Sequence, residues 1–396
     1  QDKDPLACAA EAAAQLGDLP RAIRELESAS QLAPDDLDVA ELLLRLYSME
    51  LADLANAERL DGAIALLATV EKHADRIRQR WGTRESIESL VSRAYSMLGE
   101  GYYNAGEIAR AAAFFERAKS LGLPAADALE KLATIELKRG NAAQAVRGFR
   151  NAVKVPRTNP LEDKSERAHL LRLLGEALAK SGDAKSAIDA WHEALGVFGQ
   201  VLRQRRLPGH QRAYLLTEKA RVLYNLGRRD EARIAFEQAV DTNQDDAGVY
   251  TNMIAFLLAR GHFEPALDAY HRALGRATVT EYFKVYTALW VVHFARIRGK
   301  TPDPLASGYL ASRTGKQWYC MLARFAVGSL GYDELLGMAD TRGKRAEAFF
   351  YQAMTHLARG ERRQAKKFLR LVVATDMLGF FEYDMATYFL ENGLHG

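Results

Sequence analysis

Residues 105–120, AGEIARAAAFFERAKS, contain the pattern that decides the fold. Gly106 is followed five positions later by a small residue, Ala111, then by a large apolar residue, Phe115, and by a second small residue, Ala118. Apolar residues at this spacing lie on one face of a helix, and a glycine before them suits the left-handed end of a preceding helix. The frame returns nine times along the chain, most regularly after Gly140, Gly182, Gly227 and Gly261.

Each return predicts a helical hairpin with a glycine between its two helices. The polar residues that follow three of these glycines, Asp18, Asn141 and Asp183, are suitable N-caps for the second helix. The small residue inside the second helix lets the first helix approach closely, so it is expected to be buried. One hairpin cannot bury its own apolar stripe, so the units must stack on one another. The small residues concerned are Ala111, Ala145, Ala187 and Ala232.

The frame resembles that of the tetratricopeptide repeat family, which has a period of about 34 residues. The matching upstream half is Tyr95-x-x-Leu98-Gly99-x-x-Tyr102. The resemblance implies an all-α superhelical solenoid of about nine helix-turn-helix repeats, with about 18 to 20 helices. An aromatic segment from Phe380 to Leu390 is expected to form a C-terminal capping helix.

The repeats predict one continuous solenoid in three parts: units one to four in residues 1–155, units five to seven in 156–280, and divergent units with the capping helix in 281–396. Extra residues from Ser48 to Asn56 predict a helix lengthened by two turns. Polar segments predict an exposed loop from Pro156 to Glu166 and a widened connection from Gly199 to Arg212. The prolines in Thr301–Pro304 exclude a normal second helix there.

Composition favours a globular protein with an ample core, and the resemblance to the repeat family implies that it binds other proteins. Apolar residues make up 48% of the 396, and no apolar run is long enough to span a membrane. The net charge of +3 is too small to imply nucleic acid. Charge is unevenly spread, because residues 1–80 carry 16 acidic and 9 basic side chains, whereas Arg203–Arg229 has eight basic residues against Glu218. This basic run is either an ordinary solvated face or a device that steers an acidic partner.

No pattern for catalysis, a metal or a cofactor is found. The nine histidines lack the spacing of a zinc site, and the sequence has no nucleophile elbow, phosphate loop or dinucleotide fingerprint. We therefore expect a protein that is not an enzyme. The two cysteines, Cys8 and Cys320, belong to opposite ends of the predicted stack, too far apart for a disulfide, and both are expected to be buried.

The concave groove of such a stack is the candidate binding site. Tyrosine and arginine are enriched at binding hot spots, although a tyrosine in a helical stack can equally pack against a neighbouring helix. Repeats that grip a chaperone tail need Lys and Asn at fixed positions, and among those positions only Asn252 fits, which disfavours that role. The groove candidates are Tyr103, Asn104, Lys138, Arg172, Lys180, Tyr214, Arg221, Tyr224 and Asn225.

The last hundred residues resemble bacterial envelope lipoproteins of the NlpI type. The resemblance implies a periplasm-facing scaffold for peptidases or cell-wall enzymes, with a cytoplasmic location as the alternative. Such proteins carry lipid on an N-terminal cysteine, so a lipid anchor would lie outside this chain, which begins at Gln1. Other candidate roles are the regulatory part of a larger protease or ATPase and a scaffold for polysaccharide export or secretion. The matching segments are Lys316–Trp318, Leu330–Leu335, Ala348–Ala353, Ala365–Thr375 and Phe380–Ala386.

Overall fold

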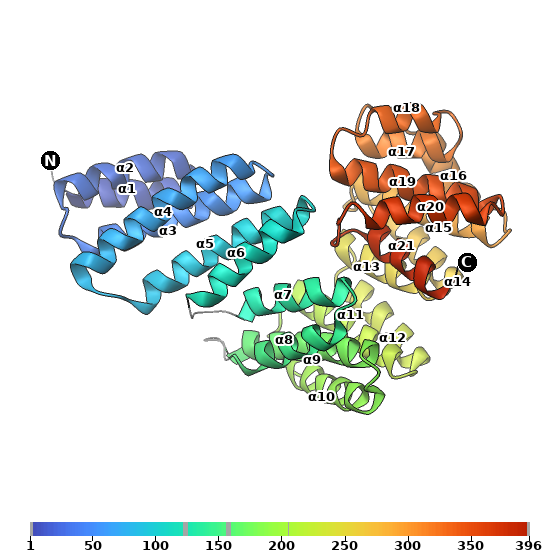
Figure 1. Ribbon diagram of the computed structural model, residues 1–396, viewed down its shortest axis with the longest axis horizontal. Coiled ribbons are helices and arrows are strands. Elements are labelled where there is room, and N and C mark those ends of the chain that lie inside the picture. Colours follow the sequence, from blue (N-terminus) through green and yellow to red (C-terminus); the bar gives the residue numbers. More distant parts are fainter. Residues whose placement is uncertain (1–2, 122–125, 156–159, 205, 394–396) are drawn as a thin grey trace. The chain divides into compact units, whose positions relative to one another are not determined.

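The computed structural model describes residues 3–121, 126–155, 160–204 and 206–393. These residues form 21 helices and no strand (Figure 1). The all-α prediction is therefore confirmed. The chain divides into two compact units, unit 1 (residues 1–157) and unit 2 (residues 158–396). Continuity of the solenoid across these units and a further division at residue 280 stay predictions.

Unit 1 is a series of four helical hairpins. Within each hairpin a first helix packs against the helix that follows it, and each second helix then contacts the next hairpin. This arrangement buries the apolar stripe that one hairpin alone would expose. In chain order the helices are α1 (Lys3–Gln15), α2 (Leu19–Leu32), α3 (Leu37–Asn56), α4 (Leu60–Trp81), α5 (Glu85–Asn104), α6 (Ile108–Ser120), α7 (Ala126–Lys138) and α8 (Ala142–Lys154).

Unit 2 begins with three further hairpins and ends in a less regular part. The hairpins are α9 (Pro160–Lys180) with α10 (Ala184–Leu202), α11 (Gly209–Asn225) with α12 (Arg229–Thr242), and α13 (Ala247–Leu258) with α14 (Phe263–Leu274). The remaining helices are α15 (Glu281–Ile297), α16 (Pro304–Ala311), α17 (Trp318–Ala326), α18 (Tyr332–Gly337), α19 (Arg342–Ala358), α20 (Arg362–Val373) and α21 (Phe381–Asn392).

Helix α15 organises this last part of unit 2. It contacts α13 and α14 before it, and α16, α17 and α19 after it. The regular frame returns only in the α19–α20 hairpin, which α21 covers as the predicted capping helix. Proline at the start of α16 and the short helices α17 and α18 take the place of one ordinary second helix. The C-terminal part therefore has more helices than its repeat count predicts.

The hairpin turns follow the predicted chemistry closely. Gly106 and Gly182 have φ angles of 73° and 89°, in the left-handed region that only glycine enters without strain. Asp18 and Asp183 accept hydrogen bonds from backbone amides of the first helical turn. Asn141 is the N-cap residue of α8 as predicted, but its side chain makes no capping hydrogen bond, and its amide nitrogen donates to Glu136. The predicted position of this cap is therefore confirmed and its predicted hydrogen bond is wrong.

The predicted small residues form the closest helix contacts. Ala111, Ala145, Ala187 and Ala232 are all buried, as expected. A glycine in the first helix of a hairpin can also let the two helices approach closely. At Gly175 of α9 a methyl group would lie 2.2 Å from the indole nitrogen of Trp191 in α10, so only a hydrogen can face that ring.

The connections between helices differ in part from the expectations. The lengthened helix through residues 48–56 is confirmed in α3. The segment from Pro160 to Glu166 is helical rather than a loop, because proline suits the first turn of α9; residues 156–159 lie outside the described part. The widened connection after Gly199 is also shorter than expected, since α10 continues to Leu202 and α11 begins at Gly209.

Cys320 is buried as predicted, but Cys8 is exposed. Cys8 lies on α1, which packs chiefly against α2, so the other faces of α1 meet no neighbouring helix. Within the described ranges, no helix is both long and apolar enough to cross a membrane.

Candidate functional site

Most of the predicted groove residues lie on two successive first helices of unit 2, α9 and α11. Helix α11 contacts α9 on one side and α13 on the other. Tyr103 and Asn104, near the end of α5, and Lys138, the last residue of α7, belong to unit 1 and form a separate set. The geometry of the α9–α11–α13 face is therefore the first place to look for a binding site.

Glu218 of α11 is the centre of this face. Its side chain is only 3% exposed. Oε2 of Glu218 accepts a hydrogen bond from Nε of Arg172 at 2.6 Å and lies 2.7 Å from Nδ1 of His169. Oε1 accepts from Nη1 of Arg221 at 3.1 Å. One buried carboxylate thus joins three side chains from two helices.

The guanidinium groups keep this carboxylate charged. Burial alone would raise the pKa of Glu218, but the positive charges of Arg172 and Arg221 outweigh it and hold the pKa well below its usual range. Burial would also lower the pKa of Arg172, and the carboxylates of Glu218 and Glu176 reverse that effect and raise it. Glu218 and Arg172 are therefore both charged at neutral pH.

Arg172 differs from the expectation for a groove residue. It is 4% exposed, and besides Glu218 it binds Oε1 of Glu176 through Nη1 at 2.8 Å. Its long side chain is enclosed because carboxylates lie both one turn along α9 and on the neighbouring helix. Arg172 thus links α9 to α11 instead of presenting its charge to a partner.

Other predicted residues remain accessible on the same face. Tyr214 is 48% exposed, with its hydroxyl 3.1 Å from Nδ1 of His169. Arg221 is partly exposed and donates through Nη2 to Oδ1 of Asn252 on α13 at 2.8 Å. Lys180 is exposed at the end of α9, and Asn225 lies half-buried on α11.

Tyr224 is held as a packing residue. Its hydroxyl lies 2.7 Å from Nε2 of His262, and its ring meets Phe256 edge-on at 5.2 Å. This matches the alternative interpretation, in which a tyrosine of the stack packs against a neighbouring helix. Tyr224 therefore supports the face by packing against its neighbours, and its ring is not free to contact a partner protein.

Arg260, two residues after the end of α13, belongs to this face and was not predicted. Its guanidinium carbon lies 3.6 Å from the centre of the Phe256 ring and 5.3 Å from that of Tyr224. Arg260 makes no ion pair within 4 Å with any described residue. Burial lowers its pKa, Glu176 partly offsets this, and the nearby charge of Arg221 lowers it further. The sequence signal for this contact is the spacing of four residues between Phe256 and Arg260 at the end of the predicted helix.

The face as a whole has more positive than negative charge. Three guanidinium groups, those of Arg172, Arg221 and Arg260, accompany two carboxylates, those of Glu176 and Glu218. Across the described ranges, no group of three or more His, Cys, Asp or Glu side chains could hold a metal ion. The arrangement can bind an anionic group through guanidinium and aromatic contacts.

Three segments of the chain match models of the tetratricopeptide repeat family. They are residues 92–117, 213–246 and 347–375. The second contains most of α11 and all of α12, and the third contains most of α19 and all of α20. These matches support a tetratricopeptide repeat protein, in agreement with the family predicted from the glycine frame.

Several solved structures are similar to this chain. A Rap protein complexed with competence and sporulation factor is 14% identical, with 97% of this chain and 99% of that chain covered and a TM-score of 0.46. BtubC from P. vanneervenii is 21% identical over 57% of this chain and 91% of its own, with a TM-score of 0.43. A thermophilic tetratricopeptide repeat protein of Thermus thermophilus is 24% identical over 51% and 99%, with a TM-score of 0.37. No curated protein matches the sequence significantly.

Stacked repeats of this kind present extended surfaces to other proteins. The three matched segments thus support a role for the chain as a protein–protein interaction scaffold.

Proposed function

We propose that this tetratricopeptide repeat protein is a non-catalytic adaptor that binds an acidic segment of a partner protein on its α9–α11–α13 face. The accessible part of that face, which we name the arginine face, consists of Tyr214, Arg221, Asn252 and Arg260, with the buried ring of Phe256 packed against Arg260. Tyrosine and arginine supply both contact area and directed hydrogen bonds, as binding hot spots require.

The unpaired guanidinium of Arg260 is the observation that carries the proposal. Glu176 only partly offsets the burial of Arg260 and its repulsion by Arg221, so a further carboxylate would stabilise this cation. Contact with the ring of Phe256 at 3.6 Å still allows the guanidinium to donate hydrogen bonds to a carboxylate. An aspartate or glutamate of a partner protein has the matching charge and shape.

The buried Glu218 cluster prepares this face for binding. Because Arg221 is held by both Glu218 and Asn252, its side chain loses little further freedom when a partner binds. Arg172 fixes α9 to α11 beneath it. The positions of the exposed groups are thus set before the partner arrives.

The test is selection of random dodecapeptides displayed on phage against the whole chain, followed by affinity measurement on the enriched peptides. We expect enrichment of Asp and Glu, and we expect Arg260→Met to weaken these peptides at least about tenfold. The matched control is Arg363→Met, which removes one exposed arginine of α20 that makes no ion pair with a described residue. Enrichment of neutral or basic peptides would contradict the proposal, as would equal losses in the two variants.

We also propose that the adaptor acts on the periplasmic side of a bacterial envelope. The support is the resemblance of its C-terminal segments to NlpI-type lipoproteins. Fractionation of cells that express the full open reading frame tests this, with protease added to intact and to permeabilised cells. Recovery with the cytoplasmic marker proteins would overturn the proposed location without affecting the binding face.

A further inference from the structure

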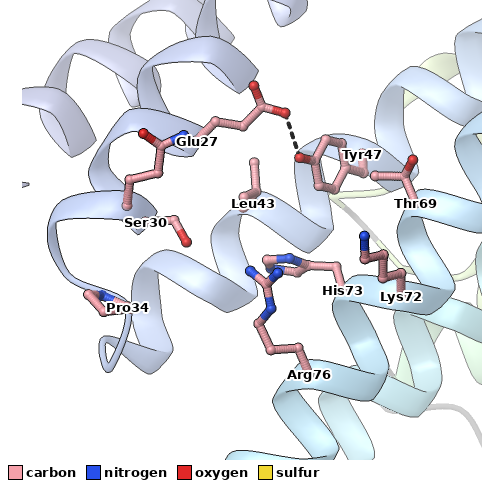
Figure 2. A pocket seen from close by; sticks show the side chains of 10 residues that line it. Glu27, Ser30, Pro34, Leu43, Tyr47, Thr69, Lys72, His73 and Arg76 are labelled. Atoms are coloured by element: carbon pink, nitrogen blue, oxygen red, sulfur yellow. Dashed lines mark hydrogen bonds between the residues drawn. The ribbon is translucent and has the colours of Figure 1, made fainter.

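A separate pocket of about 540 Å³ lies in unit 1, between α2 and α4, with α3 behind it (Figure 2). Its volume falls in the range of about 300–1,000 Å³ that is usual for ligand sites. It lies between the second helices of two successive hairpins, so it is not part of the first-helix face that the repeat pattern singles out. The pocket is lined by Glu27, Ser30, Gln31, Pro34, Leu43, Tyr47, Thr69, Lys72, His73 and Arg76.

Two cations of this pocket have no partner within the part of the chain that the structure describes. Helix α4 carries Lys72, Arg76, Arg78 and Arg80 over its last three turns. Arg78 and Arg80 are each held by carboxylates. Lys72 and Arg76 line the pocket, are exposed, and make no ion pair or hydrogen bond with a described residue. One helix thus directs its unpaired charges into the cavity.

The single carboxylate of the pocket is already engaged. Tyr47 donates its hydroxyl hydrogen to Oε1 of Glu27 at 2.7 Å, on the wall opposite Arg76 (Figure 2). Glu27 keeps its negative charge but makes no ion pair with Lys72 or Arg76. Two cations against one carboxylate leave a net positive charge in the lining, which an anionic ligand would neutralise.

Buried His73 forms the inner wall beside these cations. Its Nε2 lies 3.0 Å from the backbone carbonyl of Ala40, to which an Nε2–H donates. Burial lowers the pKa of His73, the bond to Ala40 partly opposes this, and Arg76 lowers it further. The hydroxyls of Ser30 and Thr69 lie on the flanking helices and can donate to an oxygen. The cavity thus offers charge and hydrogen-bond donors around one anionic group.

We propose that this pocket binds the side-chain carboxylate of an acidic peptide segment from a partner protein, as a second docking site distinct from the arginine face. Lys72 and Arg76 would pair with the carboxylate, and Ser30 or Thr69 would donate to its remaining lone pairs. Leu43 and Pro34 would contact the aliphatic part of the bound residue.

The surroundings favour a short acidic segment over a polyanion. Residues 1–80 carry 16 acidic and 9 basic side chains, so the pocket is a local positive site in an acidic region. A nucleic acid needs a run of cations along its phosphates, and the surrounding carboxylates repel it. A peptide with one or two carboxylates among neutral residues meets the two cations without that repulsion. Charge complementarity therefore favours a short acidic peptide over a nucleic acid as the ligand of this pocket.

The test is a nuclear magnetic resonance titration of the whole chain with the capped hexapeptide Ala-Ala-Glu-Glu-Ala-Ala, observed at the His73 ring. We expect saturable shifts of the His73 signals and none with the Gln-Gln counterpart of the peptide. Lys72→Gln combined with Arg76→Gln should weaken binding at least about tenfold. Arg24→Gln, which removes an exposed and unpaired arginine elsewhere on α2, should leave the affinity unchanged.

Each remaining outcome overturns the proposal. Equal binding of the Gln-Gln peptide, or equal losses with Arg24→Gln, removes the specific role of the two cations. Glutarate that binds as tightly as the peptide shows a small-molecule site, and preferential binding of oligothymidylate shows a nucleic-acid site. The His73 shifts in the unaltered chain decide between these outcomes even if the double variant does not fold. Arg260→Met should have no effect on these shifts, so failure here is distinguishable from failure of the arginine face.

Discussion

At Gly175 the first helix of a hairpin lies directly against the ring of Trp191 in the second helix. The indole nitrogen of Trp191 also donates to the carbonyl of Arg172 at 3.3 Å, so the ring cannot move aside without losing a hydrogen bond. In unit 1, Gly99 of α5 faces the ring of Phe115 in α6 in the same way. A missing side chain on the first helix therefore accommodates an aromatic ring on the second.

Gly175→Ala should destabilise unit 2 by at least about 1–3 kcal/mol, because the added methyl group would lie 2.2 Å from Trp191. Urea unfolding followed by circular dichroism measures the change. Gly196→Ala is the matched control, since that glycine lies in α10 with open space around its missing side chain. There the substitution should raise stability by about 0.5–1 kcal/mol through helix propensity. Equal effects at both sites would show that the Trp191 contact is looser than described.

The buried ion pairs of Glu218 stabilise the contact between α9 and α11. Glu218→Gln leaves Arg172 and Arg221 without their shared carboxylate and should cost about 3–5 kcal/mol of unfolding free energy. In contrast, Glu237→Gln breaks an exposed pair with Arg233 and should cost under about 1 kcal/mol. Chemical denaturation at neutral pH measures both. A loss at Glu218 no larger than that at Glu237 would contradict the described burial.

The carboxylate of Glu218 also predicts how the stability of the fold changes in acid. The folded-state pKa of Glu218 lies well below its ordinary value of 4.5, so its contribution is fully present above pH 4.5. That contribution is lost as the pH falls further and the carboxylate takes up a proton.

In the C-terminal helices, a buried carboxylate has a raised pKa, in contrast to Glu218. Glu347 of α19 and Glu382 of α21 are both buried, and Glu382 accepts hydrogen bonds from Nε1 of Trp290 and the hydroxyl of Tyr351. Burial, together with the charge of Glu382, raises the pKa of Glu347 to about 8. The folded chain thus binds this proton more tightly than the unfolded chain does.

Stability should therefore fall as the pH rises from about 4.5 through about 8, and Glu347→Gln should remove much of that fall. A pKa higher by one corresponds to about 1.4 kcal/mol, so the variant should melt clearly above the unaltered chain at pH 8. The melting temperatures of Glu347→Gln and the unaltered chain should converge near pH 4.5. Glu334→Gln, at an exposed carboxylate of α18, serves as the control and should leave the pH profile unchanged. A melting profile of Glu347→Gln parallel to that of the unaltered chain would refute this assignment.

The sequence predicted the hairpins well because their signals are local. Gly106 and Ala111 act within one turn and one helix contact, so a fixed spacing encodes them. Arg172 shows why the binding face was harder to predict. Its repeat position indicated an exposed groove residue, but its burial depends on Glu218, 46 residues away on another helix. Arg260 follows the helix that carries the groove positions, so a search confined to those positions misses it.

In the C-terminal part, whole helices were also hard to predict from the sequence. The prolines near residue 302 correctly exclude an ordinary second helix, but the sequence did not predict the short helices α16 and α18. They have no repeat spacing, and α15 and α19 provide the contacts that hold them. Long-range packing stabilises elements that propensity alone does not reveal.

At the level of the whole molecule, charge distinguishes the two units. Unit 1 has 24 acidic and 21 basic residues, whereas unit 2 has 27 acidic and 33 basic residues. The excess positive charge of unit 2 accompanies the unpaired Arg260 on its arginine face. A partner with an acidic segment would therefore be attracted to unit 2 before any contact forms.

Association of an acidic peptide with the arginine face should accordingly slow by about tenfold between about 50 and about 500 mM salt, with a much smaller change in dissociation. Stopped-flow fluorescence with a labelled peptide from the display selection measures both rates. The same peptide with Gln in place of Glu should show little dependence on salt. A dissociation rate that carries most of the salt effect would point to contact pairs instead of long-range attraction.

The contrast between the two cysteines gives each unit its own chemical reporter. Cys8 is exposed on α1, while Cys320 is enclosed in α17, where burial and the neighbouring Glu281 raise the pKa of its thiol. A maleimide dye should thus label the native protein once, in unit 1. Cys320 should react only when unit 2 opens, so its rate of modification in rising denaturant, read by mass spectrometry, follows the unfolding of unit 2 alone.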